Sequence, residues 1–207
     1  MRRLPRGLYA ITDGPYATTH ALETAVSAAI AGGAVMVQYR DKSGDAARRL
    51  EEAHALRALC RAARVIFIIN DDVALAAAVE ADGVHVGKGD AACHDARSCL
   101  GAQAIVGLSC YNDFSRAAQA AVLGADYVAF GSFYPSSTKP EAVPATPQLL
   151  TRAKRELDLP VVAIGGITPE NGAPLVAAGA DLLAVISGVF GAADVTAAAR
   201  AYTQLFR

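Results

Sequence analysis

GADYVAF, residues 124–130, joins a signature of glycine, alanine and aspartate to a run of apolar residues. Similar arrangements are found in GGAVMV (32–37), EADGVHV (80–86) and GADLLAV (179–185). Four further apolar runs alternate with these along the chain, LYAIT (8–12), VIFII (65–69), AIVGL (104–108) and VVAI (161–164). Continuous rather than alternating apolar runs are typical of strands that are buried on both faces. The sequence therefore predicts eight buried strands.

Alanine-rich segments with helical spacing separate these strands, for example at 21–33, 47–63, 72–81, 113–124 and 169–179. Several end on a glycine just before a strand, namely Gly32, Gly124 and Gly179, where a helix needs a left-handed closing residue. The alternation predicts an α/β protein, a (β/α)8 TIM barrel formed by one domain over residues 1–207. An open doubly wound sheet is the alternative. Its glycine-rich turn is missing, because the turn after the first strand reads TDGPYATT.

The composition limits the classes of protein to which the chain can belong. Its 19 Lys and Arg residues against 20 Asp and Glu give a formal net charge of -1, so no global positive field attracts nucleic acid. The four cysteines form no CxxC pair, which favours free thiols in a reducing compartment. No apolar stretch has the length of a signal sequence or a membrane span. We therefore expect a cytoplasmic protein without nucleic-acid or membrane partners, whose oligomeric state the sequence does not indicate.

Polar residues follow most of the predicted strands, at the end where (β/α)8 barrels carry their active sites. In QYRDK (38–42), Gln38, Arg40 and Lys42 alternate with the other two residues, so a strand would direct all three into the barrel mouth. Two adjacent cations repel each other unless an anion joins them, and a phosphate or pyrophosphate suits an arginine beside a lysine. The alternative is a strand end that continues into a solvated charged loop.

Carboxylates follow the third and fourth predicted strands. The motif NDD places Asp71 and Asp72 after Asn70, and Asp90 lies in the loop after the next strand. Mg²⁺ is usually held by one or two carboxylates and substrate phosphates, so Asp71 with Asp90 predicts a metal site. One aspartate of NDD would ligate the ion while the other caps the following helix; alternatively, both merely begin this helix. His85, within the fourth strand, is expected to line the barrel rather than to bind a ligand.

A second anion site is expected on the opposite side of the mouth. The loop FGSFYPSSTKP (130–140) brings hydroxyl side chains together with a lysine, and glycines follow the last two strands. Loops of this kind bind phosphate through backbone N–H groups, because glycine lets the anion come close. A flexible turn between prolines is the alternative. The mouth would then hold two facing anion sites, which suits two phosphorylated substrates. These sites consist of Arg40, Lys42, Asn70 and Lys139 with a metal, and of Gly166 and Ser187.

Seven motifs together resemble the thiamine phosphate synthase family, in the right order and over roughly residues 8–190. They are QYRDK, NDD, ADGVHVG followed by Asp90, GLSCYND, FGSFYPSSTKP, VVAIGGI and AVISG. The resemblance implies a TIM-barrel transferase of thiamine biosynthesis with Mg²⁺ as cofactor. It implies that 4-amino-2-methyl-5-hydroxymethylpyrimidine pyrophosphate is joined to thiazole phosphate, or to its carboxylated form. Departure of pyrophosphate would leave a carbocation-like pyrimidine, so the leaving group needs charge neutralisation rather than a strong base.

The resemblance also implies roles for individual residues. It implies pyrophosphate binding by Arg40, Lys42, Asn70 and Lys139, and metal binding by Asp71 and Asp90. It implies that the pyrimidine contacts Gln38 and Ser109, that the thiazole contacts Ser136 and Thr138, and that the thiazole phosphate contacts Gly166, Ile186 and Ser187. The residues that it implies for catalysis are Arg40, Lys42, Ser109 and Lys139.

Two alternative functions belong to other classes. Thiazole tautomerase, an isomerase on the same barrel, relies on a histidine after strand 5, where this chain has Tyr111 and a complete set of cations and carboxylates. A non-catalytic phosphate-binding regulatory protein would need an anion site but no carboxylate pair such as Asp71 and Asp90. The chain also departs from the family at Lys88 and Gly89, where relatives usually have glutamine and another polar residue.

Overall fold

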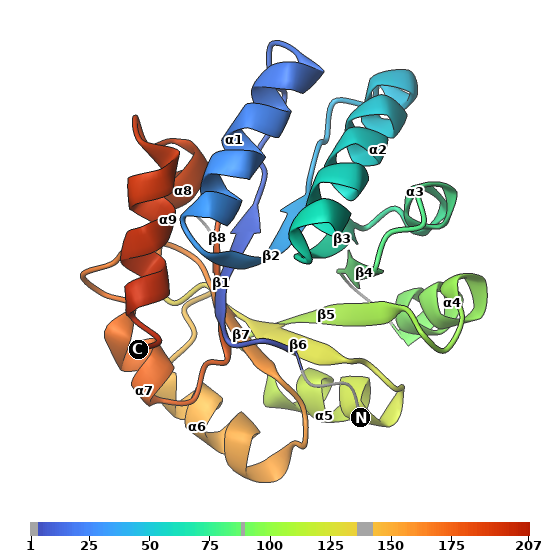
Figure 1. Cartoon of the computed structure of the whole chain (residues 1–207). Helices are drawn as coiled ribbons and strands as arrows, with labels where there is room; N and C mark the ends of the chain where they lie inside the picture. The colour runs from blue at the N-terminus through green and yellow to red at the C-terminus, as the bar shows by residue number, and fades with distance from the viewer. Residues whose placement is uncertain (1–3, 88–89, 136–142) are drawn as a thin grey trace.

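The chain folds into a closed barrel of eight parallel strands with helices around it, as the computed structural model shows (Figure 1). The structure describes residues 4–87, 90–135 and 143–207, without the side chains of residues 90–92. The strands pair in sequence order, and the last strand closes the barrel against the first. The predicted (β/α)8 TIM barrel is confirmed.

The helices and strands alternate along the chain. The strands are β1 Gly7–Ile11, β2 Ala34–Tyr39, β3 Ile66–Asn70, β4 Gly83–Val86, β5 Ile105–Tyr111, β6 Tyr127–Phe130, β7 Val161–Ile164 and β8 Leu182–Val185. The helices are α1 Thr19–Ala31, α2 Ala46–Ala63, α3 Val73–Ala78, α4 Asp90–Leu100, α5 Phe114–Val122, α6 Pro147–Glu156, α7 Ala173–Ala177, α8 Ser187–Phe190 and α9 Val195–Gln204. Each predicted apolar run overlaps one strand.

Side chains alternate between two cores along the strands, because successive residues of a strand point to opposite faces. Outward-facing residues such as Val37 and Val128 pack against the helices, whereas Met36 and Tyr127 fill the barrel interior. Each fully buried side chain of this kind contributes about 1.5–3 kcal/mol to stability. Gly107 of β5 leaves room for the Tyr127 ring, which a side chain at position 107 would strike.

The aspartate of the repeated signature joins two strands at the bottom of the barrel. The backbone N–H of Asp126 donates to the carbonyl oxygen of Val106 at 2.7 Å, and its carboxylate accepts the Val106 N–H at 2.9 Å. Arg97 adds an ion pair of 2.7 Å to Asp126. We call this set of two bonds to the backbone and one ion pair a clamp. Two equivalent clamps join Asp82 to Phe67, with Arg57 as the paired cation, and Asp181 to Val161, with Lys154 as the paired cation. The signature therefore links β3 to β4, β5 to β6 and β7 to β8.

The predicted left-handed glycines are found after two of the three helices. Gly124 and Gly179 have positive φ, at 80° and 113°. At the end of α1 the prediction is wrong by one residue, because Gly32 is right-handed and Gly33 takes the φ of 103°.

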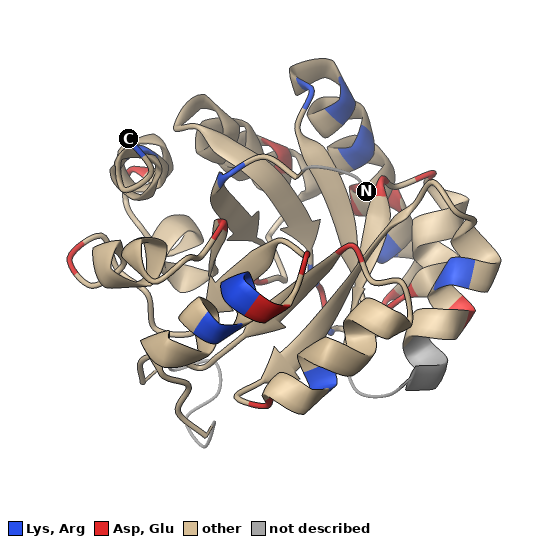
Figure 2. Ribbon diagram, turned by 90° about the horizontal axis from the view of Figure 1, so that it is seen from below, with Lys and Arg blue, Asp and Glu red and all other residues tan. Residues whose placement is uncertain are grey.

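Charged residues are spread over the surface, and the cysteines are free thiols. Acidic and basic residues are interspersed over helices and loops when the molecule is seen from below (Figure 2). The four cysteines all lie in the described part of the chain and form no disulfide, and burial raises the pKa of the Cys60 and Cys110 thiols to about 12. Within residues 4–87, 90–135 and 143–207, no helix combines the length and the apolar character that a membrane crossing needs.

Candidate active site

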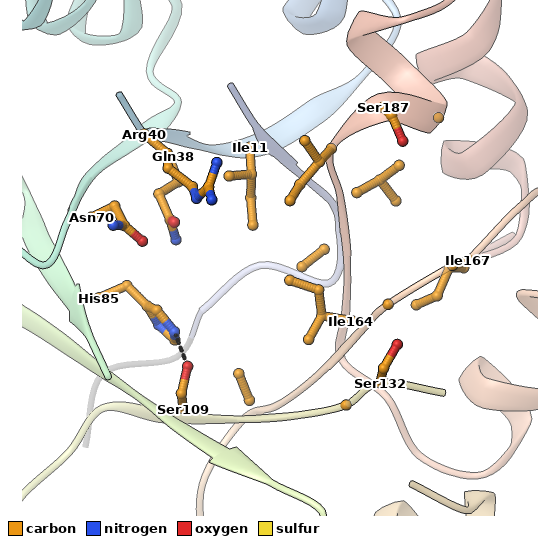
Figure 3. Close-up of a pocket in the computed structure, with 18 of the residues that line it drawn as sticks. Ile11, Gln38, Arg40, Asn70, His85, Ser109, Ser132, Ile164, Ile167 and Ser187 are labelled. Atoms are coloured by element: carbon orange, nitrogen blue, oxygen red, sulfur yellow. Dashed lines mark hydrogen bonds between the residues drawn. The ribbon is translucent and has the colours of Figure 1, made fainter. Parts of the chain in front are cut away.

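A cavity of about 400 Å³ opens at the carboxyl ends of the strands (Figure 3). This volume is in the range of small-molecule sites. Strands β2 to β5 and the residue that follows β2 contribute polar side chains to its wall, namely Gln38, Arg40, Asn70, His85, Ser109 and Tyr111. The opposite wall is formed by small or apolar residues and backbone, including Ala129, Gly131, Ile164, Gly165, Gly166 and Ile186. One cavity thus presents a polar half and a half in which backbone groups can approach a ligand.

Arg40 is held in place by the loop after β1. Thr12 Oγ1 accepts the backbone N–H of Arg40 at 2.9 Å and donates to its carbonyl oxygen at 3.3 Å. Asp13 Oδ1 accepts a bond of 2.6 Å from Arg40 Nη1. This bond uses one of five guanidinium N–H donors, so the group remains able to bind an anion at the mouth.

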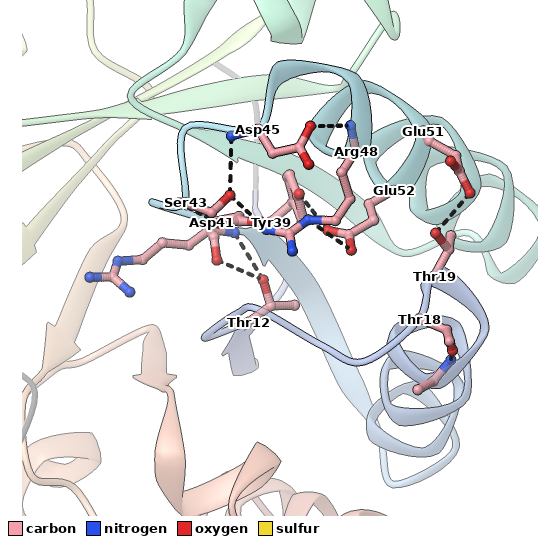
Figure 4. A network of polar contacts seen from close by, with 12 residues as sticks. Thr12, Thr18, Thr19, Tyr39, Asp41, Ser43, Asp45, Arg48, Glu51 and Glu52 are labelled. Atoms are coloured by element: carbon pink, nitrogen blue, oxygen red, sulfur yellow. Dashed lines mark hydrogen bonds and ion pairs between the residues drawn. The ribbon is translucent and has the colours of Figure 1, made fainter.

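The loop between β2 and α2 is anchored by a buried polar network (Figure 4). Arg48 Nη2 lies 2.6 Å from Asp41 Oδ2, and Arg48 Nε lies 3.7 Å from Glu52 Oε1. The Tyr39 hydroxyl donates to Glu52 at 2.6 Å. Burial alone would raise the pKa of Asp41, but hydrogen bonds from Ser43 and Arg48 hold it below its ordinary value. The network fixes the backbone that follows Arg40.

The two carboxylates of NDD have different environments, and Asp72 is the helix cap. Its side chain accepts the backbone N–H of Leu75 at 2.9 Å in the first turn of α3. It also forms an ion pair of 2.8 Å with Arg49. Asp72 is therefore engaged within the protein, and the expectation that one aspartate of the pair caps the helix is confirmed.

Asp71 is exposed and directly follows Asn70, which lines the cavity, but Asp71 is not itself one of the lining residues. Its backbone is left-handed, with φ 61°, and Asn70 Nδ2 donates to its Oδ2 at 2.8 Å. Asp71 Oδ1 lies 3.7 Å from the place that a Cβ of Gly87 would occupy, in the loop after β4. The carboxylate therefore faces the loop that leads to Asp90.

A chain of hydrogen bonds runs beneath the polar half of the cavity. Gln38 Nε2 donates to Tyr9 Oη at 2.5 Å, and Tyr9 Oη lies 2.9 Å from Tyr127 Oη. His85 Nδ1 is 3.0 Å from Tyr127 Oη, and His85 Nε2 is 2.9 Å from Ser109 Oγ. Burial raises the pKa of both tyrosines well above the ordinary value, so both phenols stay protonated. His85 lines the cavity, as predicted.

The loops after β6 and β7 support each other across the second half of the mouth. Tyr134 N–H donates to Gly165 O at 3.0 Å, and Ser132 Oγ donates to Tyr134 O at 2.7 Å. Gly166 has φ 61°, and a Cβ there would strike the carbonyl oxygens of Tyr134 and Pro135. Position 166 therefore requires glycine for its backbone conformation and for this close loop contact.

The structure brings many of the predicted site residues together. Those that line the cavity are Gln38, Arg40, Asn70, Ser109, Gly166, Ile186 and Ser187. Lys42 is exposed and is not among the lining residues, because β2 ends at Tyr39 and its alternation does not continue that far. The predicted residues that lie outside the described part of the chain are Lys88, Gly89, Ser136, Thr138 and Lys139, together with the side chain of Asp90.

Sequence reasoning missed three residues that hold the polar half. Asp13 is one of the polar residues that follow the strands but received no role, although a carboxylate after the first strand can face a cation after the second. Tyr9 and Tyr127 lie in runs that were counted only as apolar. Their inward positions, in the same interior as Gln38, were the available signal.

Comparisons with known proteins agree with this geometry. The chain matches the family model for thiamine monophosphate synthase over residues 8–189. It is 56% identical over 209 residues to the thiamine-phosphate synthase of Thiobacillus denitrificans, an alignment covering 100% of this chain and 97% of that protein. It is 51% identical over 201 residues to the thiamine-phosphate synthase of Nitrosococcus oceani, covering 97% and 93%.

A solved structure gives the same result. The thiamine phosphate pyrophosphorylase from Pyrococcus furiosus superimposes with a TM-score of 0.84 at 33% sequence identity, covering 97% of this chain and 95% of that one. The likeness therefore extends over nearly the whole chain. The chain belongs to the thiamine monophosphate synthase family.

Proposed function

We propose that this chain is a thiamine phosphate synthase, a transferase that acts in the cytoplasm on two small molecules. It joins 4-amino-2-methyl-5-hydroxymethylpyrimidine pyrophosphate to a thiazole phosphate and releases pyrophosphate. The observation that carries the proposal is a single cavity in which Gln38, Arg40 and Ser109 face Gly166 and the end of β8. Relatives named for this activity match nearly the whole chain at about half identity, which supports it.

The pyrophosphate group would bind to the cations of the polar half. Arg40 presents a guanidinium that Asp13 orients, and guanidinium suits the paired oxygens of a phosphate. Lys42, Asn70 and Lys139 would complete this site. The developing charge on the leaving pyrophosphate is then met by groups that are already in place, which is worth about 10²–10³ in rate for one such contact.

The residues at the rim fit Mg²⁺. Asp71 is an exposed carboxylate that Asn70 orients and that faces the loop leading to Asp90, whereas Asp72 is engaged by a helix and by Arg49. Carboxylate oxygens completed by substrate phosphates are the donors that this hard cation prefers. Asp71 and Asp90 would hold the ion, and when bound it neutralises charge on the pyrophosphate.

The two rings would lie between the cation site and the glycine half. Gln38 and Ser109 would hydrogen-bond the pyrimidine, and Ser136 with Thr138 would contact the thiazole. Gly166, with Ile186 and Ser187, would receive the thiazole phosphate, since a residue without a side chain exposes its backbone to an anion. The reacting carbon of the pyrimidine and the thiazole nitrogen would then meet inside the cavity rather than in bulk water.

The test is a direct assay of the joining reaction. Purified protein is incubated with both substrates and Mg²⁺, and thiamine phosphate and pyrophosphate are measured separately. We expect equal amounts of the two products and none when either substrate is omitted. Pyrophosphate without thiamine phosphate would indicate a hydrolase. Isomerisation of a thiazole carboxylate phosphate without pyrophosphate release would indicate a tautomerase, and either result overturns the proposal.

A further inference from the structure

The hydrogen-bond chain beneath the cavity has a direction, because each hydroxyl group carries one hydrogen. Gln38 Nε2 gives a hydrogen to the Tyr9 oxygen, which leaves the hydrogen of Tyr9 for Tyr127 at 2.9 Å. Both phenols are at most 1% exposed, and a buried O–H without an acceptor is costly. The hydrogen of Tyr127 is in turn left for His85 Nδ1 at 3.0 Å.

The direction continues through the imidazole ring to the cavity. A histidine that accepts at Nδ1 is neutral and carries its hydrogen on Nε2. Nε2 then donates to Ser109 Oγ at 2.9 Å, and the hydroxyl hydrogen of Ser109 is left for a ligand. At the other end, Gln38 Oε1 has no hydrogen-bond partner within the described residues, and Gln38 lines the cavity. The cavity therefore meets an acceptor at Gln38 and a donor at Ser109.

We propose that Tyr9, Tyr127 and His85 are positioning residues that fix this direction and thereby select a 4-aminopyrimidine over its 4-oxo analogue. The inference rests on the proposed function, because it takes the ring beside Gln38 and Ser109 to be the pyrimidine. An aminopyrimidine presents an N–H donor next to a ring nitrogen that accepts, which complements Gln38 Oε1 and the Ser109 hydroxyl. The oxo analogue presents a carbonyl acceptor next to a ring N–H, which is the reverse pattern.

The selection is strong because the two ends are coupled. Gln38 can turn an N–H in place of its oxygen toward the ligand only if its amide rotates, both phenols turn and His85 changes tautomer. The tyrosine at the centre is also held rigidly. Its ring stacks on His85 with centroids 5.5 Å apart, and Gly107 leaves it a slot in the barrel interior. An isolated glutamine would rotate to suit either ring, whereas Gln38 cannot reverse unless the whole hydrogen-bond chain reverses with it.

The first test measures kcat/KM for the aminopyrimidine pyrophosphate and for its 4-oxo analogue. In the native protein we expect a preference for the amino compound of at least about 100-fold, since buried polar groups reject a ligand that leaves them unpaired. Tyr127→Phe removes the central hydroxyl and releases both ends, so the preference should fall about 10-fold or more. Tyr9→Phe releases only Gln38, because Tyr127 can still donate to His85, and its effect should be smaller.

The matched control is Tyr202→Phe. Tyr202 is also buried, at 1% exposure, but it is not part of the hydrogen-bond chain, because its hydroxyl donates to the backbone oxygen of Ile167 at 3.0 Å. This variant should keep the amino preference of the native protein within about twofold, whatever it loses in stability. Thermal unfolding of all three variants shows whether a change in preference follows from the missing bond or from a loss of folded protein.

The second test reads the imidazole directly and needs no turnover. Nitrogen-15 NMR of the protein without substrates should show His85 neutral with the hydrogen on Nε2, and Tyr127→Phe should abolish this single tautomer. A hydrogen on Nδ1 in the native protein, or an unchanged preference in Tyr127→Phe, overturns the proposal. If Tyr127→Phe does not fold, Tyr9→Phe and the native NMR spectrum decide. Absence of thiamine phosphate formation would instead refute the proposed function, and the NMR result would still test the direction of the chain.

Discussion

The two ends of the barrel use the same kinds of residue in opposite ways. At the bottom, Asp126 accepts a backbone N–H and pairs with Arg97, and the two equivalent aspartates do the same. At the mouth, Arg40 uses one of its donors on Asp13, and Asp71 accepts from Asn70 at the exposed rim. Polar groups with complete sets of partners hold the fold, whereas groups with remaining capacity are free to bind a ligand. Residue type alone does not separate the two.

The largest expected effect comes from replacing, one at a time, an arginine at each end of the barrel. Arg40→Ala should reduce kcat/KM by about 100-fold or more, since it removes one preorganised contact to the leaving group, with little change in unfolding free energy. Arg97→Ala should do the reverse, because Arg97 bonds to backbone carbonyls and to Asp126 at the bottom. Steady-state kinetics and urea unfolding on both variants provide the measurement. Equal losses of activity would end the distinction between the two ends.

Removing one clamp should weaken the fold without touching the reaction. Asp126→Ala leaves the Val106 N–H and Arg97 without this carboxylate, and an unsatisfied buried group costs about 1–3 kcal/mol. We expect the unfolding free energy to fall by about 2 kcal/mol, with kcat within about twofold of the native value. Urea denaturation measures the first quantity. A collapse of kcat in fully folded protein would place the bottom of the barrel in the active site.

Two adjacent aspartates allow the comparison to be made within one motif. Asp71→Asn should raise the Mg²⁺ concentration for half-maximal activity about tenfold, which corresponds to about 1.4 kcal/mol. Asp72→Asn, its matched control, should leave the Mg²⁺ requirement unchanged and lower stability through the cap and the Arg49 pair. Mg²⁺ titrations of activity distinguish them. The same shift in both variants would mean that the metal does not discriminate between these carboxylates.

The smallest effect is expected at Asp41, in the loop after β2, whose carboxylate is already bonded to Ser43 and Arg48. Its pKa is held low by Ser43 and Arg48 against the effect of burial, so the ionised form is favoured in the folded protein. This contribution to stability is present above the pKa of an unfolded aspartate, about 3.9, and is lost as the pH falls through the lower pKa of the folded state. Asp41→Asn should therefore unfold with a weaker dependence on pH below about 4. Identical pH profiles of unfolding would show that the ion pair with Arg48 contributes nothing.

The barrel followed from the sequence because its main features are local. Continuous apolar runs mark strands buried on both faces, and alanine-rich segments with closing glycines mark helices between them. The repeated aspartate was visible as a pattern, but its role in joining neighbouring strands was not. Each carboxylate bonds to a strand about 15 to 20 residues earlier in the chain, which a local pattern does not indicate. The extent of β5 was also missed, because Ser109 and Tyr111 interrupt the apolar run while the strand continues.

The site was predictable where a polar residue ends a strand, as Asn70 does, or directly follows one, as Arg40 does. It was not predictable where the decisive fact is a contact between distant elements. The Tyr9 and Tyr127 hydroxyls meet across 118 positions in the sequence, and the bond of Arg40 to Asp13 spans 27. For Lys42 only the assumed alternation is corrected, because β2 ends at Tyr39, before it reaches residue 42.

The clamps at the bottom of the barrel also define how the protein can be divided. Each clamp cation lies on an even-numbered helix, and its aspartate lies just before the even-numbered strand that comes two strands later in the chain. Arg97 of α4, for example, pairs with Asp126 before β6. A segment from α4 to β6 thus carries a complete clamp, and so do the segments α2 to β4 and α6 to β8. Chimeras of related barrels should tolerate crossovers in the loops between these segments and fail more often at crossovers within them. Because those loops surround the cavity, a recombination experiment could replace one wall of the active site as an intact quarter of the barrel.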